Sequence, residues 1–282
     1  MASVLITGTS KGIGLETALA FGRAGYKVYA TMRNPSQSPL LAETASLEKL
    51  PISISTMDVD SDKSVRDGIA AILNSNGSID VLVNNAGVEA VGSVEDLPLA
   101  IFRAIMETNY FGALRCIKEL LPQMRQRRSG CIINVSSVAG RLSSPPMIPY
   151  CASKWALEAL TEGLAGEMKT FNVRVASVEP GIIDTAMARR IEDPHAESPY
   201  KQSARFSTLF AGALKDPVPP SLVAQKILEI AESGTWQLRH PVGPDALPFL
   251  QWRSQMADEA WVEMNAGDDE TFFSRLAESN QN

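Results

Sequence analysis

The chain has 282 residues, and its 26 basic and 32 acidic side chains give a formal net charge of −6, which disfavours nucleic-acid binding. Its hydrophobic content of 45% and charged content of 21% are those of an ordinary globular protein. No apolar run approaches the roughly 20 residues of a membrane span, and the first residues lack a signal peptide's basic region, so we expect a cytoplasmic protein. Three scattered cysteines and two histidines predict neither a disulfide framework nor a metal site.

Short apolar runs rich in β-branched residues alternate with helical patterns along the chain. They predict strands at residues 4–6, 27–30, 52–56, 80–83, 131–135 and 173–178, with a seventh at 235–238 after a helix at 221–231. Because the runs are apolar throughout, the strands should be buried on both faces of a parallel sheet. The sequence therefore predicts one α/β domain, a doubly wound, Rossmann-type sheet of about seven strands with helices on both faces.

A glycine-rich turn joins the first predicted strand to the first helix. Glycines allow a tight turn and let the backbone approach a pyrophosphate closely, while the free N–H groups of the helix start face the anion. An ordinary strand-to-helix turn is the alternative, but three glycines in seven residues would be generous for it. The turn residues that we expect to contact a dinucleotide are Gly8, Ser10, Lys11, Gly12, Ile13 and Gly14.

Further motifs follow the turn in a fixed order. They are Asn-Asn-Ala-Gly at 84–87, Asn-Val-Ser-Ser at 134–137, Tyr-Cys-Ala-Ser-Lys at 150–154 and Pro-Gly-Ile-Ile-Asp-Thr at 180–185. With the Gly-x3-Gly-x-Gly turn, they make residues 2–190 resemble the classical short-chain dehydrogenase/reductase (SDR) family. Residues 28–33 and the long C-terminal part are similar, more loosely, to the 17β-hydroxysteroid and retinol dehydrogenase branch. The resemblance implies a nicotinamide-dependent oxidoreductase.

Tyr150 and Lys154 are four residues apart in a segment with helical periodicity, so their side chains share one face. A nearby cation favours the phenolate and would lower a tyrosine pKa from its usual value near 10. The resemblance implies that Tyr150 is the general acid/base and that Lys154 lowers its pKa and holds the nicotinamide ribose. It also implies a serine that hydrogen-bonds the substrate oxygen; the family's spacing selects Ser137, with Ser136 as the alternative.

Asn109 lies in the long helical stretch after the fourth strand. The resemblance implies that this asparagine kinks the helix and orders a water that links Lys154 to solvent. The alternative is a surface amide on the helix. The resemblance also implies cofactor contacts after several strands, at Asp58 and Val59 for adenine, and otherwise at Asn85, Ala86, Gly87, Tyr150, Lys154, Pro180, Gly181, Ile183 and Thr185.

The residues after the second strand predict which nicotinamide is used. A site selective for NAD needs a carboxylate there, but Met32 stands where the family would place it. Arg33 can form two hydrogen bonds with a 2′-phosphate, and Lys11 can approach that phosphate from the glycine turn. We therefore predict NADP(H), the alternative being that both residues are ordinary surface cations.

The chain after residue 185 is expected to form the part of the protein that binds the substrate. We divide the domain into a cofactor-binding and catalytic core at 1–185, a proline-rich substrate loop or lid at 186–220, a last helix and strand at 221–240, and a C-terminal extension at 241–282 that covers the substrate or mediates self-association. His195 in the lid could touch the substrate. Apolar residues in the lid and between the catalytic serine and tyrosine predict a bulky, largely apolar substrate. The alternative is that these residues pack the lid or a subunit contact. They are Leu142, Pro145, Pro146, Met147, Ile191, Phe206, Leu209 and Phe210.

Two other functions compete with an oxidoreductase. A nucleotide-sensing binding protein would need the glycine turn but not Ser137, Tyr150 and Lys154 together. An epimerase or dehydratase of the extended branch would carry a Gly-x-x-Gly-x-x-Gly turn, which this chain lacks. We expect a carbonyl or alcohol that is a small molecule as the substrate, no nucleic-acid partner, no membrane span, and the homodimer or homotetramer usual in the family.

Overall fold

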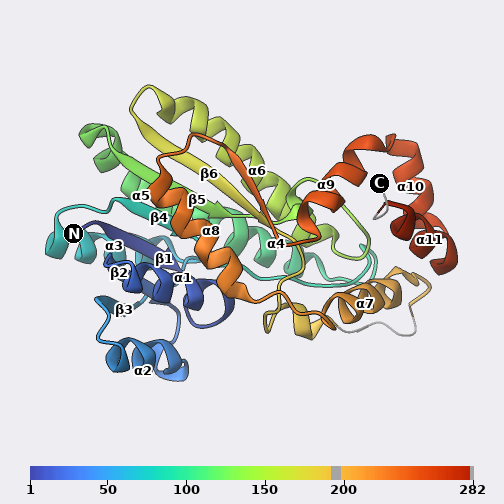
Figure 1. Cartoon of the computed structure of the whole chain (residues 1–282), viewed down its shortest axis with the longest axis horizontal. Coiled ribbons are helices and arrows are strands. Elements are labelled where there is room, and N and C mark those ends of the chain that lie inside the picture. The colour runs from blue at the N-terminus through green and yellow to red at the C-terminus, as the bar shows by residue number, and fades with distance from the viewer. Residues whose placement is uncertain (192–197, 280–282) are drawn as a thin grey trace.

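The computed structural model, which describes residues 1–191 and 198–279, confirms the predicted fold class. Within these residues a sheet of seven strands has the order β3-β2-β1-β4-β5-β6-β7 (Figure 1), and each neighbouring pair is parallel. The strands are β1 (Ser3–Thr7), β2 (Lys27–Met32), β3 (Ile52–Thr56), β4 (Val81–Asn84), β5 (Gly130–Val135), β6 (Val173–Pro180) and β7 (Arg239–Val242).

Helices pack on both faces of this sheet. Helices α1 and α8 cover one face, while α3, α5 and α6 cover the other. The helices are α1 (Gly12–Arg23), α2 (Leu40–Leu47), α3 (Asp62–Asn76), α4 (Leu99–Met106), α5 (Gly112–Arg127), α6 (Ile148–Lys169), α7 (Gln202–Ala213), α8 (Pro220–Ser233), α9 (Ala246–Gln255), α10 (Asp258–Ala266) and α11 (Asp269–Ser279).

The apolar runs form strands because both of their faces are covered. In β1, Val4 and Ile6 belong to the apolar cluster under α1 and α8, whereas Leu5 belongs to the cluster on the opposite face. All three side chains are fully buried. Successive side chains of a strand point to opposite faces, so only a run that is apolar throughout satisfies both layers.

The predicted seventh strand at 235–238 was wrong in position. The strand is β7, where Arg239 pairs with Ser177 of β6. Residues 234–238 are a surface connection in which Trp236 is 43% exposed. Pro241 disfavours a strand in the sequence pattern, but β7 is at the sheet edge, where a missing ladder donor is tolerated.

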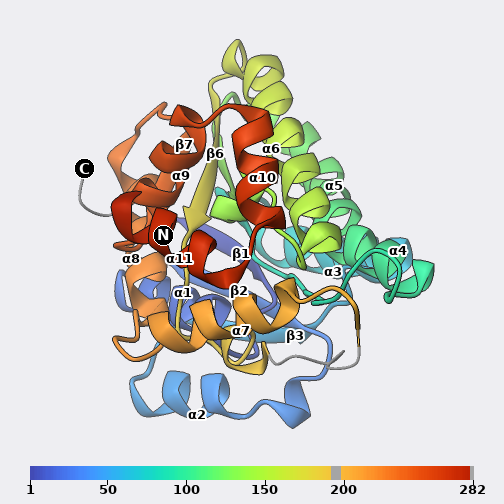
Figure 2. The ribbon, with the colours of Figure 1, turned by 90° about the vertical axis from the view of Figure 1, so that its right-hand side faces the viewer.

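The C-terminal helices α9, α10 and α11 lie at the same end of the molecule as α7 (Figure 2). The indole N–H of Trp261 donates to the Ser143 carbonyl at 2.8 Å, which fixes α10 against the segment before the predicted tyrosine. Arg205 of α7 is 6% exposed and donates to the carboxylate of Asp269 and the carbonyl of Asn265. These contacts join the extension to α7 and to the segment before Tyr150; that it covers the substrate or mediates self-association stays a prediction.

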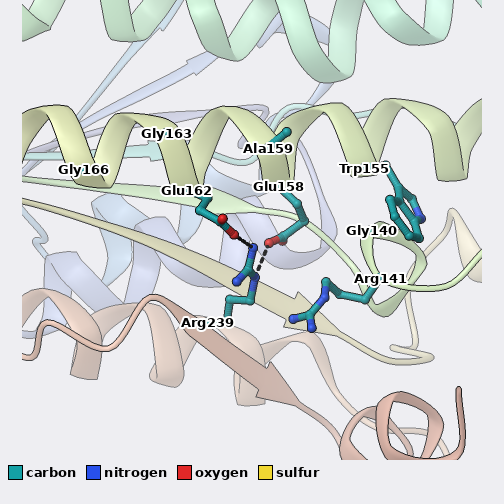
Figure 3. A pocket seen from close by; sticks show the side chains of 9 residues that line it. All are labelled: Gly140, Arg141, Trp155, Glu158, Ala159, Glu162, Gly163, Gly166 and Arg239. Carbon is teal, nitrogen blue, oxygen red and sulfur yellow. Dashed lines mark hydrogen bonds and ion pairs between the residues drawn. The ribbon is translucent and has the colours of Figure 1, made fainter. Parts of the chain in front are cut away.

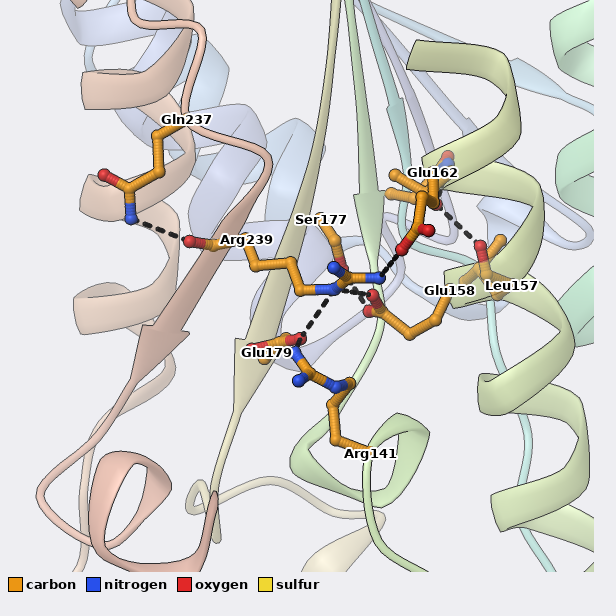
Figure 4. A network of polar contacts seen from close by, with 10 residues as sticks. Arg141, Leu157, Glu158, Glu162, Ser177, Glu179, Gln237 and Arg239 are labelled. Atoms are coloured by element: carbon orange, nitrogen blue, oxygen red, sulfur yellow. Dashed lines mark hydrogen bonds and ion pairs between the residues drawn. The ribbon is translucent and has the colours of Figure 1, made fainter. Parts of the chain in front are cut away.

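A surface hollow beside α6 and β7 contains none of the predicted site residues (Figure 3). Its polar wall is a network in which Arg239 contacts Glu158 at 2.9 Å and Glu179 at 3.6 Å (Figure 4). The Glu179 side chain is 1% exposed, and Arg141 contacts it at 3.3 Å. Burial and the charge of Glu158 raise the pKa of Glu179, while the two arginines lower it.

Replacing Arg239 with Met is expected to destabilise the fold by about 2 kcal/mol at neutral pH, because two buried carboxylates lose their shared cation. A Glu179 pKa raised in the folded state means that the native protein holds its proton more tightly, so stability falls as pH rises through that pKa. Urea unfolding at pH 5 and pH 8 should give a smaller loss at pH 5. Arg23→Met, which breaks an exposed pair with Glu48, is the control and should lower the stability by less than about 1 kcal/mol. Equal losses of stability at pH 5 and pH 8 for Arg239→Met would contradict the argument.

Candidate active site

The predicted cofactor contacts all line one cleft of about 680 Å³ at the carboxyl ends of the strands, a volume typical of ligand sites. Ser136 and Ser137 line it as well. The predicted contacts in its wall are Gly8, Ser10, Lys11, Gly12, Ile13, Gly14, Arg33, Asp58, Val59, Asn85, Ala86, Gly87, Tyr150, Lys154, Pro180, Gly181, Ile183 and Thr185.

Residues after β4 brace the glycine turn. The Asn85 amide donates to the carbonyls of Thr7 and Gly8 at 2.9 and 3.1 Å. The Thr7 hydroxyl accepts the backbone N–H groups of Asn85 and Ala86, both at 3.0 Å. The Asn-Asn-Ala-Gly motif thus holds the turn in one shape from the neighbouring strand.

Two glycines of this turn are required by close approaches. Gly8 has φ of +70°, and a Cβ on it would lie 2.7 Å from the Ala86 Cα atom. A Cβ on Gly14 would lie 2.3 Å from the Gly8 carbonyl oxygen. Helix α1 begins at Gly12 without a side-chain cap, so its first N–H groups are available to an anion. The turn therefore fits the pyrophosphate of a dinucleotide.

Ser137, Tyr150 and Lys154 come together as the spacing predicted. Ser137 follows β5, and its hydroxyl accepts the Ala139 N–H at 3.1 Å. In α6, the Lys154 ammonium lies 5.6 Å from the centre of the Tyr150 ring and donates to the Val135 carbonyl at 2.8 Å. Ser136 is 3% exposed, and its hydroxyl oxygen has no partner among the described residues, whereas Ser137 is less buried. The geometry favours Ser137 over Ser136 as the serine that reaches a substrate.

The Tyr150 pKa is shifted in the opposite direction to the one the sequence predicted. Burial raises the pKa of the phenol, the charge of Glu89 raises it further, and a hydrogen bond with Ser137 lowers it. Burial also lowers the pKa of Lys154 to about 8, against the opposing charge of Glu158. The predicted effect of Lys154 on Tyr150 is wrong for this structure because the ammonium is directed to the Val135 carbonyl and burial outweighs it.

Asn109 is buried, which rules out the surface amide. It lies in a π-helical turn, Glu107–Phe111, between α4 and α5. Its side chain accepts the Val88 N–H at 2.8 Å and donates to the Val88 carbonyl and the Ser153 hydroxyl, both at 2.9 Å. Asn109 therefore fixes the segment after β4 to α6, the helix that carries Tyr150. The helix irregularity agrees with the predicted kink, and the ordered water stays a prediction.

Two cations lie at the predicted adenosine end of the cleft. Lys11 and Arg33 are both exposed, and in the described part of the chain neither side chain forms a hydrogen bond or ion pair. Met32 is buried beside Arg33 and brings no charge. Both cations are thus available to a phosphate.

Asp245, just before α9, supports the opposite end of the cleft. Its carboxylate accepts the Ile182 N–H at 2.7 Å, and a Cβ on Gly181 would lie 2.1 Å from one carboxylate oxygen. That contact explains why Gly181 has no side chain. Sequence reasoning missed Asp245 because it is 63 residues from Ile182, and no local pattern connects the two.

The substrate end is less uniformly apolar than predicted. Of the eight predicted apolar residues, only Ile191 lines the cleft. Phe206 and Met147 pack with Tyr150 and Val91, and Leu142 packs against the C-terminal extension. His195 lies outside the described residues. The cleft wall also contains Glu89, which the sequence prediction missed although it is a carboxylate within the apolar stretch 88–91.

Comparison with known proteins identifies the family. The model for short chain dehydrogenases matches residues 2–196. The protein belongs to the short-chain dehydrogenase family. The matched residues include the glycine turn, Ser137, Tyr150 and Lys154.

Its relatives include retinol and hydroxysteroid dehydrogenases. Retinol dehydrogenase 8 of Bos taurus is 44% identical over 188 residues, which are 65% of this chain and 59% of the relative. Estradiol 17-beta-dehydrogenase 1 of Rattus norvegicus is 35% identical over 266 residues, 89% of this chain and 76% of the relative. A crystal structure of a short-chain dehydrogenase from Streptomyces avermitilis superposes with a TM-score of 0.78 at 30% identity, covering 90% of this chain and 92% of that one. No helix among the described residues is long and apolar enough to cross a membrane.

Proposed function

We propose that this protein is an NADP(H)-dependent oxidoreductase that transfers hydride between the nicotinamide and a carbonyl or secondary alcohol of a bulky, largely apolar substrate. The observation that carries the proposal is the convergence of Ser137, Tyr150 and Lys154 in the cleft that also contains the glycine turn. A nucleotide-sensing protein would have no need of that trio. A homo-oligomer and a cytoplasmic location stay predictions.

The residues of the cleft divide the work of the reaction. A bound nicotinamide would supply or accept the hydride. Tyr150 moves the proton to or from the substrate oxygen, and the Ser137 hydroxyl donates a hydrogen bond to that oxygen. Lys154 holds the ribose hydroxyls, and Asn109 keeps the segment after β4 in place. The raised pKa of Tyr150 keeps the phenol protonated at neutral pH, which is the form that donates to a carbonyl oxygen.

The choice of substrate class rests on the apolar part of the cleft wall. Ala90, Val91, Met187, Ala188 and Ile191 line it. Apolar walls favour ligands with apolar surface, because burial of that surface contributes about 25 cal/mol per Å². Retinol and estradiol, named in the two relatives, are ligands of this kind.

A screen of carbonyls and alcohols with NADPH, NADH and their oxidised forms tests the substrate class. We expect kcat/KM for steroid-like, retinoid-like or aromatic ketones to exceed that for small polar sugars by about tenfold or more, as the burial of several apolar groups would give. The absorbance of the reduced nicotinamide follows turnover. A preference for the sugars would overturn the proposed class while leaving the oxidoreductase reaction in place.

A further inference from the structure

Glu89 is an unusual side chain for its place in the molecule. It lines the cleft between Val88 and Ala90, in a stretch of the wall, residues 88–91, that is otherwise apolar. It is only partly exposed, and in the described part of the chain its carboxylate forms no hydrogen bond and no ion pair. A ligand that fills the cleft would remove this carboxylate from water, which is costly unless the ligand supplies a hydrogen-bond donor.

The backbone next to Glu89 is held in place. Its neighbour Val88 is held at both its N–H and its carbonyl by the Asn109 amide, at 2.8 and 2.9 Å. Glu89 and Tyr150 line the same cleft, and the charge of Glu89 raises the pKa of the Tyr150 phenol. The carboxylate therefore stands near the proposed reacting end of the cleft, on a backbone that cannot easily withdraw it.

Glu89 differs from the cations and carboxylates elsewhere in the cleft. Asp58 and Asp60 follow β3 and line the adenosine end of the cleft. Lys11 and Arg33 line the same end, where an adenosine phosphate would bind. Lys154 is already directed to the Val135 carbonyl. Neither these groups nor Arg190, which lines the cleft after β6, is paired with Glu89 in the described part of the chain, so its carboxylate is available to solvent or to a bound ligand.

We propose that Glu89 determines substrate specificity by accepting a hydrogen bond from a donor group, a hydroxyl or an ammonium, on an otherwise apolar carbonyl substrate. This inference rests on the proposed function and narrows it, since a purely hydrocarbon ketone would leave the carboxylate buried and unpaired. Burial raises the pKa of Glu89 to about 7, so the group is partly ionised at neutral pH and a bound donor would favour the ionised form.

Matched ketones and two variants test the inference. The probes are acetophenones carrying a hydroxymethyl or an aminomethyl group at the meta or para position, each compared with the ethyl-substituted ketone of similar size. Glu89→Leu removes the acceptor, and Glu89→Gln keeps an acceptor but removes the charge. Glu232→Leu, at the exposed end of α8 and outside the cleft wall, is the control.

We expect wild-type kcat/KM to favour at least one donor-bearing ketone over its ethyl counterpart, and Glu89→Leu to reduce that preference about tenfold, the scale of one hydrogen bond to a charged group. Glu89→Gln should retain part of a hydroxyl preference and lose an ammonium preference, which distinguishes the two donors. Glu232→Leu should change neither. An unchanged preference in Glu89→Leu would overturn the inference.

Calorimetric titration of the same ketones into wild type and Glu89→Leu, both with NADPH, separates this inference from the proposed function. If none of the ketones is reduced, the proposed reaction fails, but selective binding of the donor-bearing ketone by wild type alone would still support the role of Glu89. If both proteins bind the two kinds of ketone in the same ratio, the role of Glu89 is refuted whether or not turnover is seen.

Discussion

Replacing Tyr150 with Phe is expected to lower kcat at least about a hundredfold, the usual effect of removing a positioned proton donor. The substitution deletes only the hydroxyl, and the ring keeps its packing with Met147 and Phe206. The fold and the binding of NADPH should therefore change little. Turnover with the best ketone of the screen and NADPH titration by nicotinamide fluorescence measure the two quantities separately.

The two adjacent serines provide a matched control for this result. Ser137→Ala should also lower kcat, because it removes a hydrogen bond both to Tyr150 and to the substrate oxygen. Ser136→Ala should leave kcat nearly unchanged, since that hydroxyl is buried. A folded Tyr150→Phe protein with near-normal turnover would show that another group moves the proton.

The parts of the fold and site that depend on local pattern could be predicted from the sequence. β1 follows from a run that must be apolar on both faces, and the glycine turn from close approaches that exclude a Cβ at Gly8 and Gly14. The spacing of Tyr150 and Lys154 places them on one face of α6, where the structure has them. In each case the physical constraint acts within a few residues of the pattern.

Features set by distant contacts could not be predicted. β7 starts at Arg239 because β6 pairs with it there, and Asp245 accepts the Ile182 N–H from 63 residues further along the chain. The direction of the Tyr150 pKa shift depends on burial and on Glu89, which no spacing within α6 reveals. These are properties of the assembled cleft and require coordinates.

Replacing Arg33 with Asp is expected to abolish or invert a preference for NADP over NAD. Arg33 and Lys11 are exposed in the same cleft and are not paired with a protein carboxylate in the described part of the chain. Each solvated contact to the 2′-phosphate should contribute about 1.5 to 3 kcal/mol, so together they favour NADP by roughly two orders of magnitude or more. The ratio of kcat/KM for NADPH and NADH at moderate salt measures the preference, because phosphate contacts of this kind are screened by salt.

The aspartate variant acts on selectivity in two ways. It removes the cation that attracts the 2′-phosphate, and it places a carboxylate after β2, where an NAD-selective site would hold the ribose hydroxyls. Turnover at saturating cofactor should stay close to that of wild type, since Arg33 is remote from Ser137 and Tyr150 in the sheet order, with β2 separated from β5 by β1 and β4. Lys11→Met should give a smaller change in the same direction. It removes only the ammonium, a point charge that recognises a phosphate less specifically than the planar guanidinium of Arg33, which stays in place. If wild type binds NADH as tightly as NADPH, the two cations are surface charges and the assignment to NADP(H) is wrong.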